Sequence, residues 1–175
     1  LKSKVYAIAA FVIISTLLVF TISMILGGIY SDYNEFRIIF SDLEYLLAYA
    51  VNLFGFFIYC LFLSILIKRA AFAIGFLALC QFVEFMIYGL MRWKLPDLIP
   101  QLSAEQIINF FPLHALGNLI KEPFTRLSAI QNFADQIGEG FNKDYGVSTL
   151  NMSIVMLWSA LFILGSYALL KRRDL

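Results

Sequence analysis

Residues 45–91 read YLLAYAVNLFGFFIYCLFLSILI-KR-AAFAIGFLALCQFVEFMIYGLM, and this stretch decides the fold. The 23 residues before Lys68 carry no charge, and the 22 residues after Arg69 carry only one, Glu84. A helix rises about 1.5 Å per residue, so each apolar run can cross a hydrocarbon core roughly 30 Å thick. Two residues between such runs leave room only for a tight turn. The stretch therefore predicts a helical hairpin through a bilayer, with Lys68 and Arg69 on the cytoplasmic side.

The composition also indicates a membrane protein. Of the 175 residues, 61% are hydrophobic and 14% are charged, and the mean hydropathy is +0.83. Soluble domains are about 45–50% apolar and about a quarter charged. A net charge of +1, without a long Lys/Arg run, argues against nucleic acid as a partner. Cys60 and Cys80 both fall inside predicted spans, where we interpret them as small apolar residues rather than a disulfide or part of a metal site.

Two further apolar runs complete a four-span arrangement. One follows Lys2 and Lys4 without a charge up to Ser31, and the other precedes the basic ending Lys171-Arg-Arg-Asp-Leu175. The predicted fold class is an all-α integral membrane protein with four transmembrane helices. We expect one transmembrane domain over residues 1–175, with spans at about 5–29, 46–67, 70–91 and 147–170, and an outer helical segment at 92–146.

The outer segment contains signals for several short helices. Pro96 and Pro100 are expected to break the chain after the third span, and Ser103-Ala-Glu-Gln106 has the form of a capping box. Pro112 can open the next helix, with Leu113, Leu116 and Ile120 on one face. An amphipathic piece then runs from Pro123 to about Ile137. Between the first two spans, residues 32–44 suggest a short interfacial helix.

The apolar run Ile107–Ile120 lies within this outer segment. At 14 residues it is too short to span a bilayer but is typical of a re-entrant or interfacial element. It holds the sole histidine, His114, which has no His or Cys neighbour in sequence. We interpret His114 as a solvated or helix-end residue rather than a metal ligand.

Basic residues sort to one side of the predicted membrane. Seven of the thirteen fall at the boundaries that four alternating spans would place together: Lys2, Lys4, Lys68, Arg69, Lys171, Arg172 and Arg173. By the positive-inside rule, both chain ends and the hairpin turn are cytoplasmic. Arg92 and Lys94, at the outer end of the third span, run against the rule.

Residues suited to catalysis are scarce. The sequence has no G-x-S-x-G, no H-E-x-x-H and no G-x-x-x-x-G-K-[ST] motif, and with a single histidine a Ser-His-Asp or Cys-His mechanism has little to draw on. We therefore predict that the chain is not an enzyme, and that it carries no catalytic residue, cofactor or metal of its own.

Glu84 is the one ionisable residue inside a predicted span. Gln81, Glu84 and Tyr88 are spaced i, i+3, i+7 and form a polar stripe on an otherwise apolar helix. An intramembrane acid normally faces a bundle interior, a water-filled cavity or a partner. The stripe could line a substrate path. Alternatively, Glu84 hydrogen-bonds between helices, or is buried as a protonated carboxyl. Asn52 in the second span could likewise line the path, or it could hydrogen-bond between helices.

The order of these features resembles the permease subunit of ATP-binding-cassette transporters of the type-2 exporter class. The tight turn at Lys68-Arg69, the outer segment 92–146 and the ending Gly165-Ser-Tyr-Ala-Leu-Leu-Lys-Arg-Arg-Asp-Leu175 match the last four of the six spans in such permeases. The family's first two spans, and the cytoplasmic coupling helix between them, have no counterpart in the chain. The first residue is Leu1 rather than Met, and we expect those spans to precede it in a longer protein.

The resemblance implies a mechanism with a partner. A separate or fused nucleotide-binding subunit would hydrolyse ATP near the turn at Lys68 and Arg69, and two permease copies, alike or different, would pair in the cell membrane. Their spans would open alternately inward and outward, with the outer helices as a gate. A non-transporting four-span anchor or accessory subunit of a membrane complex is the alternative. An intramembrane enzyme would have only one carboxylate and no histidine pair in its spans.

Overall fold

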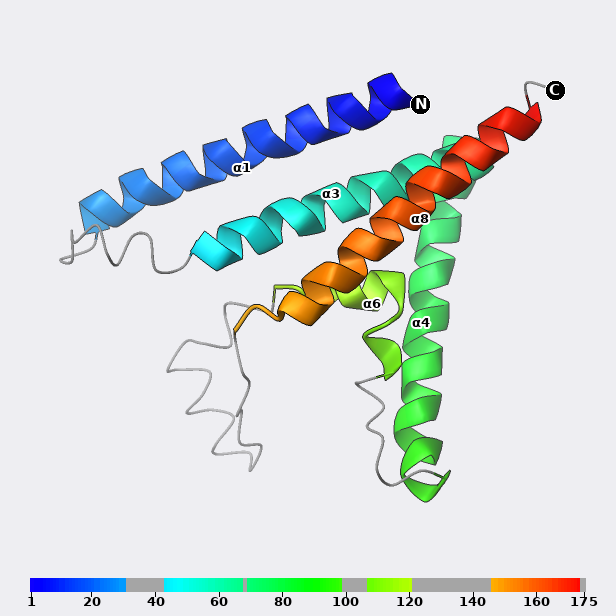
Figure 1. Ribbon diagram of the computed structural model, residues 1–175. Coiled ribbons are helices and arrows are strands. Elements are labelled where there is room, and N and C mark those ends of the chain that lie inside the picture. The colour runs from blue at the N-terminus through cyan, green and yellow to red at the C-terminus, as the bar shows by residue number, and fades with distance from the viewer. Residues whose placement is uncertain (31–42, 68, 99–106, 121–145, 174–175) are drawn as a thin grey trace.

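The computed structural model describes residues 1–30, 43–67, 69–98, 107–120 and 146–173 (Figure 1). Within these ranges the chain is helical and contains no strand. Four long helices are each apolar enough to cross a membrane, and a short fifth helix precedes the last of them. The helices are α1 (Lys2–Tyr30), α3 (Leu43–Leu66), α4 (Ala70–Leu98), α6 (Pro112–Gly117) and α8 (Thr149–Arg173). The predicted fold class is confirmed, and the chain is a multi-pass membrane protein.

The junction between α3 and α4 is as short as the sequence predicts. Helical hydrogen bonding continues to Ile67, whose N–H donates to the Leu63 carbonyl at 2.8 Å. It resumes at once, because Ala73 N–H donates to the Arg69 carbonyl at 3.1 Å. The Arg69 side chain is exposed, and Lys68 lies outside the described residues.

The third helix is longer than predicted. We expected it to end near Met91 and Pro96 to break the chain, but α4 continues through Pro96 to Leu98. That part of the prediction is wrong: α4 lacks the hydrogen bond that an N–H at position 96 would donate, but it ends only two residues after Pro96, so little of the helix lies beyond the proline. The helix ends two residues before Pro100, and a proline disfavours helical geometry in the residue that precedes it.

The core of the molecule lies between α3 and α8. Gly55 lies against Val155 and Ser159, and the ring of Phe62 lies against Gly165. The residue numbers of the contacting positions therefore increase together along both helices, so α3 and α8 run parallel. The second and fourth of four alternating spans must also run parallel. Between these two levels, the rings of Tyr59 and Phe162 have centroids 4.9 Å apart.

Helix α1 packs on the outside of this core. It runs antiparallel to α3 (Figure 1), and Phe11 meets Phe57 edge to face with ring centroids 5.3 Å apart. Val12 is the only residue of α1 that is buried against the described part of the chain. Most of the other large apolar side chains of α1 are exposed, which suits a helix that faces lipid.

Three chain boundaries lie toward one end of the molecule. Figure 1 places the start of α1, the α3–α4 junction and the end of α8 in the same part of the structure. The basic residues at these boundaries that the structure describes as exposed are Lys2, Lys4, Arg69, Lys171 and Arg172. These boundaries thus lie near one another, while α4 runs away from them at a steep angle to the other long helices (Figure 1).

Several predicted short helices lie outside the described residues. These are most of the interfacial helix at 32–44, the capping box at Ser103–Gln106 and the amphipathic piece from Pro123 to Ile137. They stay predictions.

Candidate functional site

Residues 107–120 form a compact element that packs among the long helices, and we call it the re-entrant element. A helical turn at Ile107–Ile108 is followed by a change of direction at 109–111 and then by α6. Pro112 occupies the first turn of α6, as predicted. The element contacts α3, α4 and α8. Five of its apolar side chains are buried: Ile108, Leu113, Ala115, Leu116 and Leu119.

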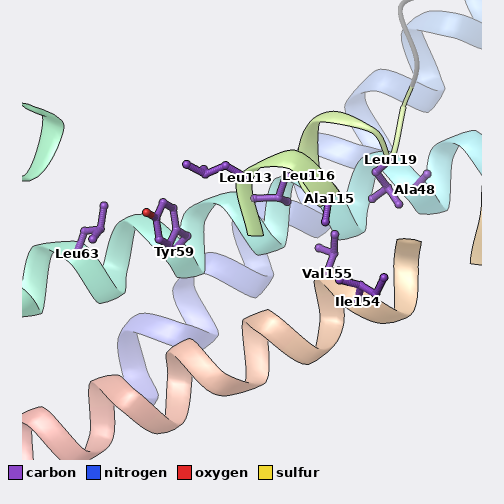
Figure 2. Packing of buried hydrophobic residues seen from close by; sticks show 9 residues of the cluster. All are labelled: Ala48, Tyr59, Leu63, Leu113, Ala115, Leu116, Leu119, Ile154 and Val155. Carbon is purple, nitrogen blue, oxygen red and sulfur yellow. The ribbon is translucent and has the colours of Figure 1, made fainter. Parts of the chain in front are cut away.

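The buried face of the re-entrant element completes the core. Figure 2 shows Leu113, Ala115 and Leu116 of α6 over helix α3, with Val155 of α8 close by. A β-carbon built on Gly55 would lie 3.0 Å from Leu116 Cδ2, so the absence of a side chain at Gly55 is what lets α6 approach so closely. The predicted apolar face of Leu113, Leu116 and Ile120 therefore packs against the spans, with Ile120 half-buried.

The turn before α6 places backbone polar groups beside largely apolar helices, and a backbone polar group in the hydrocarbon region of a membrane needs a partner within the protein. A helix begins with N–H groups that have no partner inside the helix. In α6 the first helical residue is Pro112, which has no N–H at all. Leu113 N–H donates to Glu84 Oε1 at 3.3 Å, and His114 N–H donates to Glu84 Oε2 at 2.8 Å. Ala115 N–H then makes the first regular helical bond, to the Phe111 carbonyl at 2.8 Å.

The side chain of Glu84 thus accepts hydrogen bonds from both N–H groups at the start of α6 that have no partner within the helix. It lies midway along α4, and its residue is only 7% exposed. No side chain of the re-entrant element caps α6 itself, so the cap comes entirely from another helix. The carboxylate also lies at the positive end of the helix dipole, which favours a negative charge there.

A second spanning helix binds the same turn. Trp158 of α8 donates its Nε1–H to the Phe110 carbonyl at 2.7 Å. Within the element, the Asn118 side-chain amide donates to Asn109 Oδ1 at 2.7 Å, which ties the segment before the turn to the segment after α6. The start of α6 is therefore attached to α4 through two N–H groups, and the turn before it is attached to α8 through a carbonyl.

The predicted path residues fall in different environments. Glu84 and Tyr88 both face the re-entrant element, with the Tyr88 and His114 ring centroids 5.4 Å apart. Gln81 is exposed. Asn52 is half-buried on α3. Of the four residues, the structure brings together Glu84 and Tyr88, and their common contact is His114.

Some residues of the site were not singled out from the sequence. Trp158 lies in the interior of its helix, whereas tryptophan in membrane proteins is enriched at the interfaces, and that position was the available signal. Gly55 in the middle of an apolar run was a similar signal for close helix packing. The partners of Glu84 and Trp158 are backbone groups, which every residue type offers, so no sequence pattern marks them.

The arrangement offers hydrogen bonding and packing rather than an evident reaction centre. Within the described ranges, no group of three or more His, Cys, Asp and Glu side chains could hold a metal ion. Cys60 and Cys80 are free thiols on α3 and α4, each half-buried. No protein-family model, curated protein or solved structure matches the chain. A functional assignment therefore depends on the chain's own residues.

Proposed function

We propose that the chain is the permease subunit of an ATP-binding-cassette export system and forms part of the substrate path across the cell membrane. The observation that supports this function most directly is the re-entrant element held between α4 and α8. It follows the third span, as the outer helices of type-2 exporter permeases do. The short α3–α4 junction lies at the opposite end of α4, where such permeases have their tight cytoplasmic turn.

The proposal fixes the orientation of the chain. Both ends and the α3–α4 junction face the cytoplasm, because the exposed basic residues at these boundaries favour that side. Lys68 and Arg69 then lie where an ATPase subunit approaches the membrane. ATP is bound and hydrolysed on that partner, separate or fused, and a second permease copy completes the path.

Within this function the four predicted path residues take different parts. Gln81 is exposed on α4 and is open to a passing substrate or to lipid. Glu84 and Tyr88 act through the re-entrant element that they contact. Asn52, half-buried on α3, has the weakest connection to the site.

The test is to purify the full-length protein, with an affinity tag, from its native membranes. A permease should retain an ATPase subunit with a phosphate-loop motif, identified by mass spectrometry, and the complex should hydrolyse ATP. The exposed Arg69 allows a sharper version. Arg69→Glu should reduce recovery of the ATPase, and the matched change Lys4→Glu on α1 should not. Recovery of other membrane subunits and no ATPase would instead support a four-span anchor or accessory subunit.

A further inference from the structure

Within the described part of the chain, one narrow stripe of side chains attaches helix α4 to the other helices. In the half nearest the α3–α4 junction, Ala73, Leu77 and Cys80 pack against the core. Beyond Cys80 the stripe continues with Glu84, the only buried residue of α4 among those whose side chains the structure describes, and with the half-buried Tyr88. Both residues contact α6.

Among the residues that the structure describes, the outer half of α4 has little other support. Figure 1 shows α4 diverging from α3 and α8 with distance from the junction, and α4 has little direct contact with α8. The re-entrant element stands between them. Its apolar side chains belong to the core shared with α3 and α8, against which the inner half of α4 also packs. The element meets the outer half of α4 through the two Glu84 hydrogen bonds and the Tyr88–His114 ring contact.

We infer that Glu84 is a latch that holds the outer half of α4 against the re-entrant element. When the two bonds from Glu84 to Leu113 and His114 open, the outer half of α4 can move away from α8, while α3, α8 and the re-entrant element stay packed together. Counted over the described residues, the two arrangements differ by two hydrogen bonds and one ring contact, so the outer half of α4 can exist in two states without the core being rebuilt. The inference concerns the chain itself and does not depend on an ATPase partner.

The latch can be tested by distance measurements between spin labels on the full-length protein in lipid nanodiscs. Labels are attached to cysteines in a background with Cys60→Ala and Cys80→Ala. One pair, Trp93→Cys on α4 with Leu150→Cys on α8, reports the position of the outer half of α4. A second pair, Leu47→Cys on α3 with Leu150→Cys, reports the core. All three native side chains are well exposed.

Glu84→Ala should lengthen and broaden the distance distribution of the α4–α8 pair and leave the α3–α8 pair unchanged. Gln81→Ala, one turn earlier on an exposed position of α4, is the matched control and should alter neither pair. The inference is overturned if the α4–α8 distances of folded Glu84→Ala match those of the parent. It is equally overturned if both pairs broaden together, because Glu84 would then support the whole bundle.

A second variant covers the case in which Glu84→Ala does not fold. Glu84→Gln keeps the size of the side chain but has one acceptor oxygen in place of two, and its NH₂ group faces a donor. It should produce an intermediate shift in the α4–α8 pair alone. An unshifted distribution in folded Glu84→Gln, with Glu84→Ala unfolded, would assign Glu84 a role in folding and reject the latch.

Discussion

The Glu84 carboxylate lies 2.8 Å from the backbone nitrogen of His114, thirty positions later in the chain. This contact explains an acidic residue in the middle of an apolar helix. The change of chain direction at 109–111 starts a new helix, and its first N–H groups have no partner within that helix. Pro112 has no N–H, and Glu84 accepts hydrogen bonds from the next two N–H groups, those of Leu113 and His114. Two residues that are far apart in the sequence, Glu84 and Pro112, thus together account for the first N–H positions of α6.

The first prediction concerns the stability contributed by Glu84. Glu84→Ala leaves the N–H groups of Leu113 and His114 without their acceptor, and we expect a loss of about 1–2 kcal/mol. Glu84→Gln retains one acceptor and should lose roughly half as much. The measurement is the unfolding free energy in mixed micelles, with Gln81→Ala as the control. Equal stability of Glu84→Ala and the parent protein would contradict the capping role.

The second prediction concerns the attachment to α8. Trp158→Phe keeps an aromatic ring that can stack on Phe162, whose ring centroid lies 5.5 Å away, but removes the donor to the Phe110 carbonyl. We expect a loss of about 0.5–1.5 kcal/mol. The matched control is Trp93→Phe, because Trp93 is 73% exposed on α4. If both substitutions cost the same, the hydrogen bond to Phe110 contributes nothing specific.

A double-mutant cycle of these two attachments tests whether they hold one element. Trp158→Phe and Glu84→Gln act on groups only a few residues apart in the re-entrant element, so their effects on the unfolding free energy should not add. Once one attachment is lost, the element can shift and the other bond is worth less. Simple additivity would mean that the two helices hold the turn independently.

The sequence predicted the spans because their signal is local. A charge-free run of sufficient length reports a span without knowledge of its neighbours, and Lys68-Arg69 between two such runs reports the hairpin. Pro112 as a helix start and the packing face of α6 were readable for the same reason. Glu84 stood out as the sole acid within a span.

The features that could not be predicted are contacts between groups that are far apart in the sequence. Gln81 was assigned to the face of Glu84 from its spacing, yet at about 100° per residue it lies about 60° from Glu84 around the helix, and it is exposed. The partners of Glu84 and Trp158 are backbone atoms, so residue type does not reveal them. Only the packing of α6 against α3 and α8 brings those atoms within reach.

The third prediction concerns the close approach at Gly55. A β-carbon there would lie 2.8 Å from Val155 Cγ1, and Val155 is 2% exposed and stiff at its β-carbon. Gly55→Ala should therefore destabilise the protein by about 1–3 kcal/mol, which outweighs the gain in helix propensity. Gly75→Ala on α4 is the control, because nothing lies within 4 Å of a β-carbon added there, and this substitution should be neutral or stabilising. Adding Val155→Ala should partly restore Gly55→Ala, and a failure to do so would place the strain elsewhere.

The last prediction concerns orientation, and it follows from the sorting of Lys and Arg. Single cysteines are placed at Tyr30, Arg69, Gln131 and Arg173 in the background without Cys60 and Cys80, and cells are treated with a membrane-impermeant maleimide. If four spans alternate with both ends cytoplasmic, Tyr30→Cys and Gln131→Cys label in intact cells, and Arg69→Cys and Arg173→Cys label only after permeabilisation. Tyr30 ends α1, and Arg69 lies at the α3–α4 junction, so these two positions test sidedness on helices that the structure describes.

A fully inverted pattern would retain the four spans but place the chain ends outside, so that the positive-inside rule fails for this protein. A mixed pattern would be more damaging. It would mean that one of the four helices does not cross the membrane, and the parallel pairing of α3 with α8 would then have to arise in some other way.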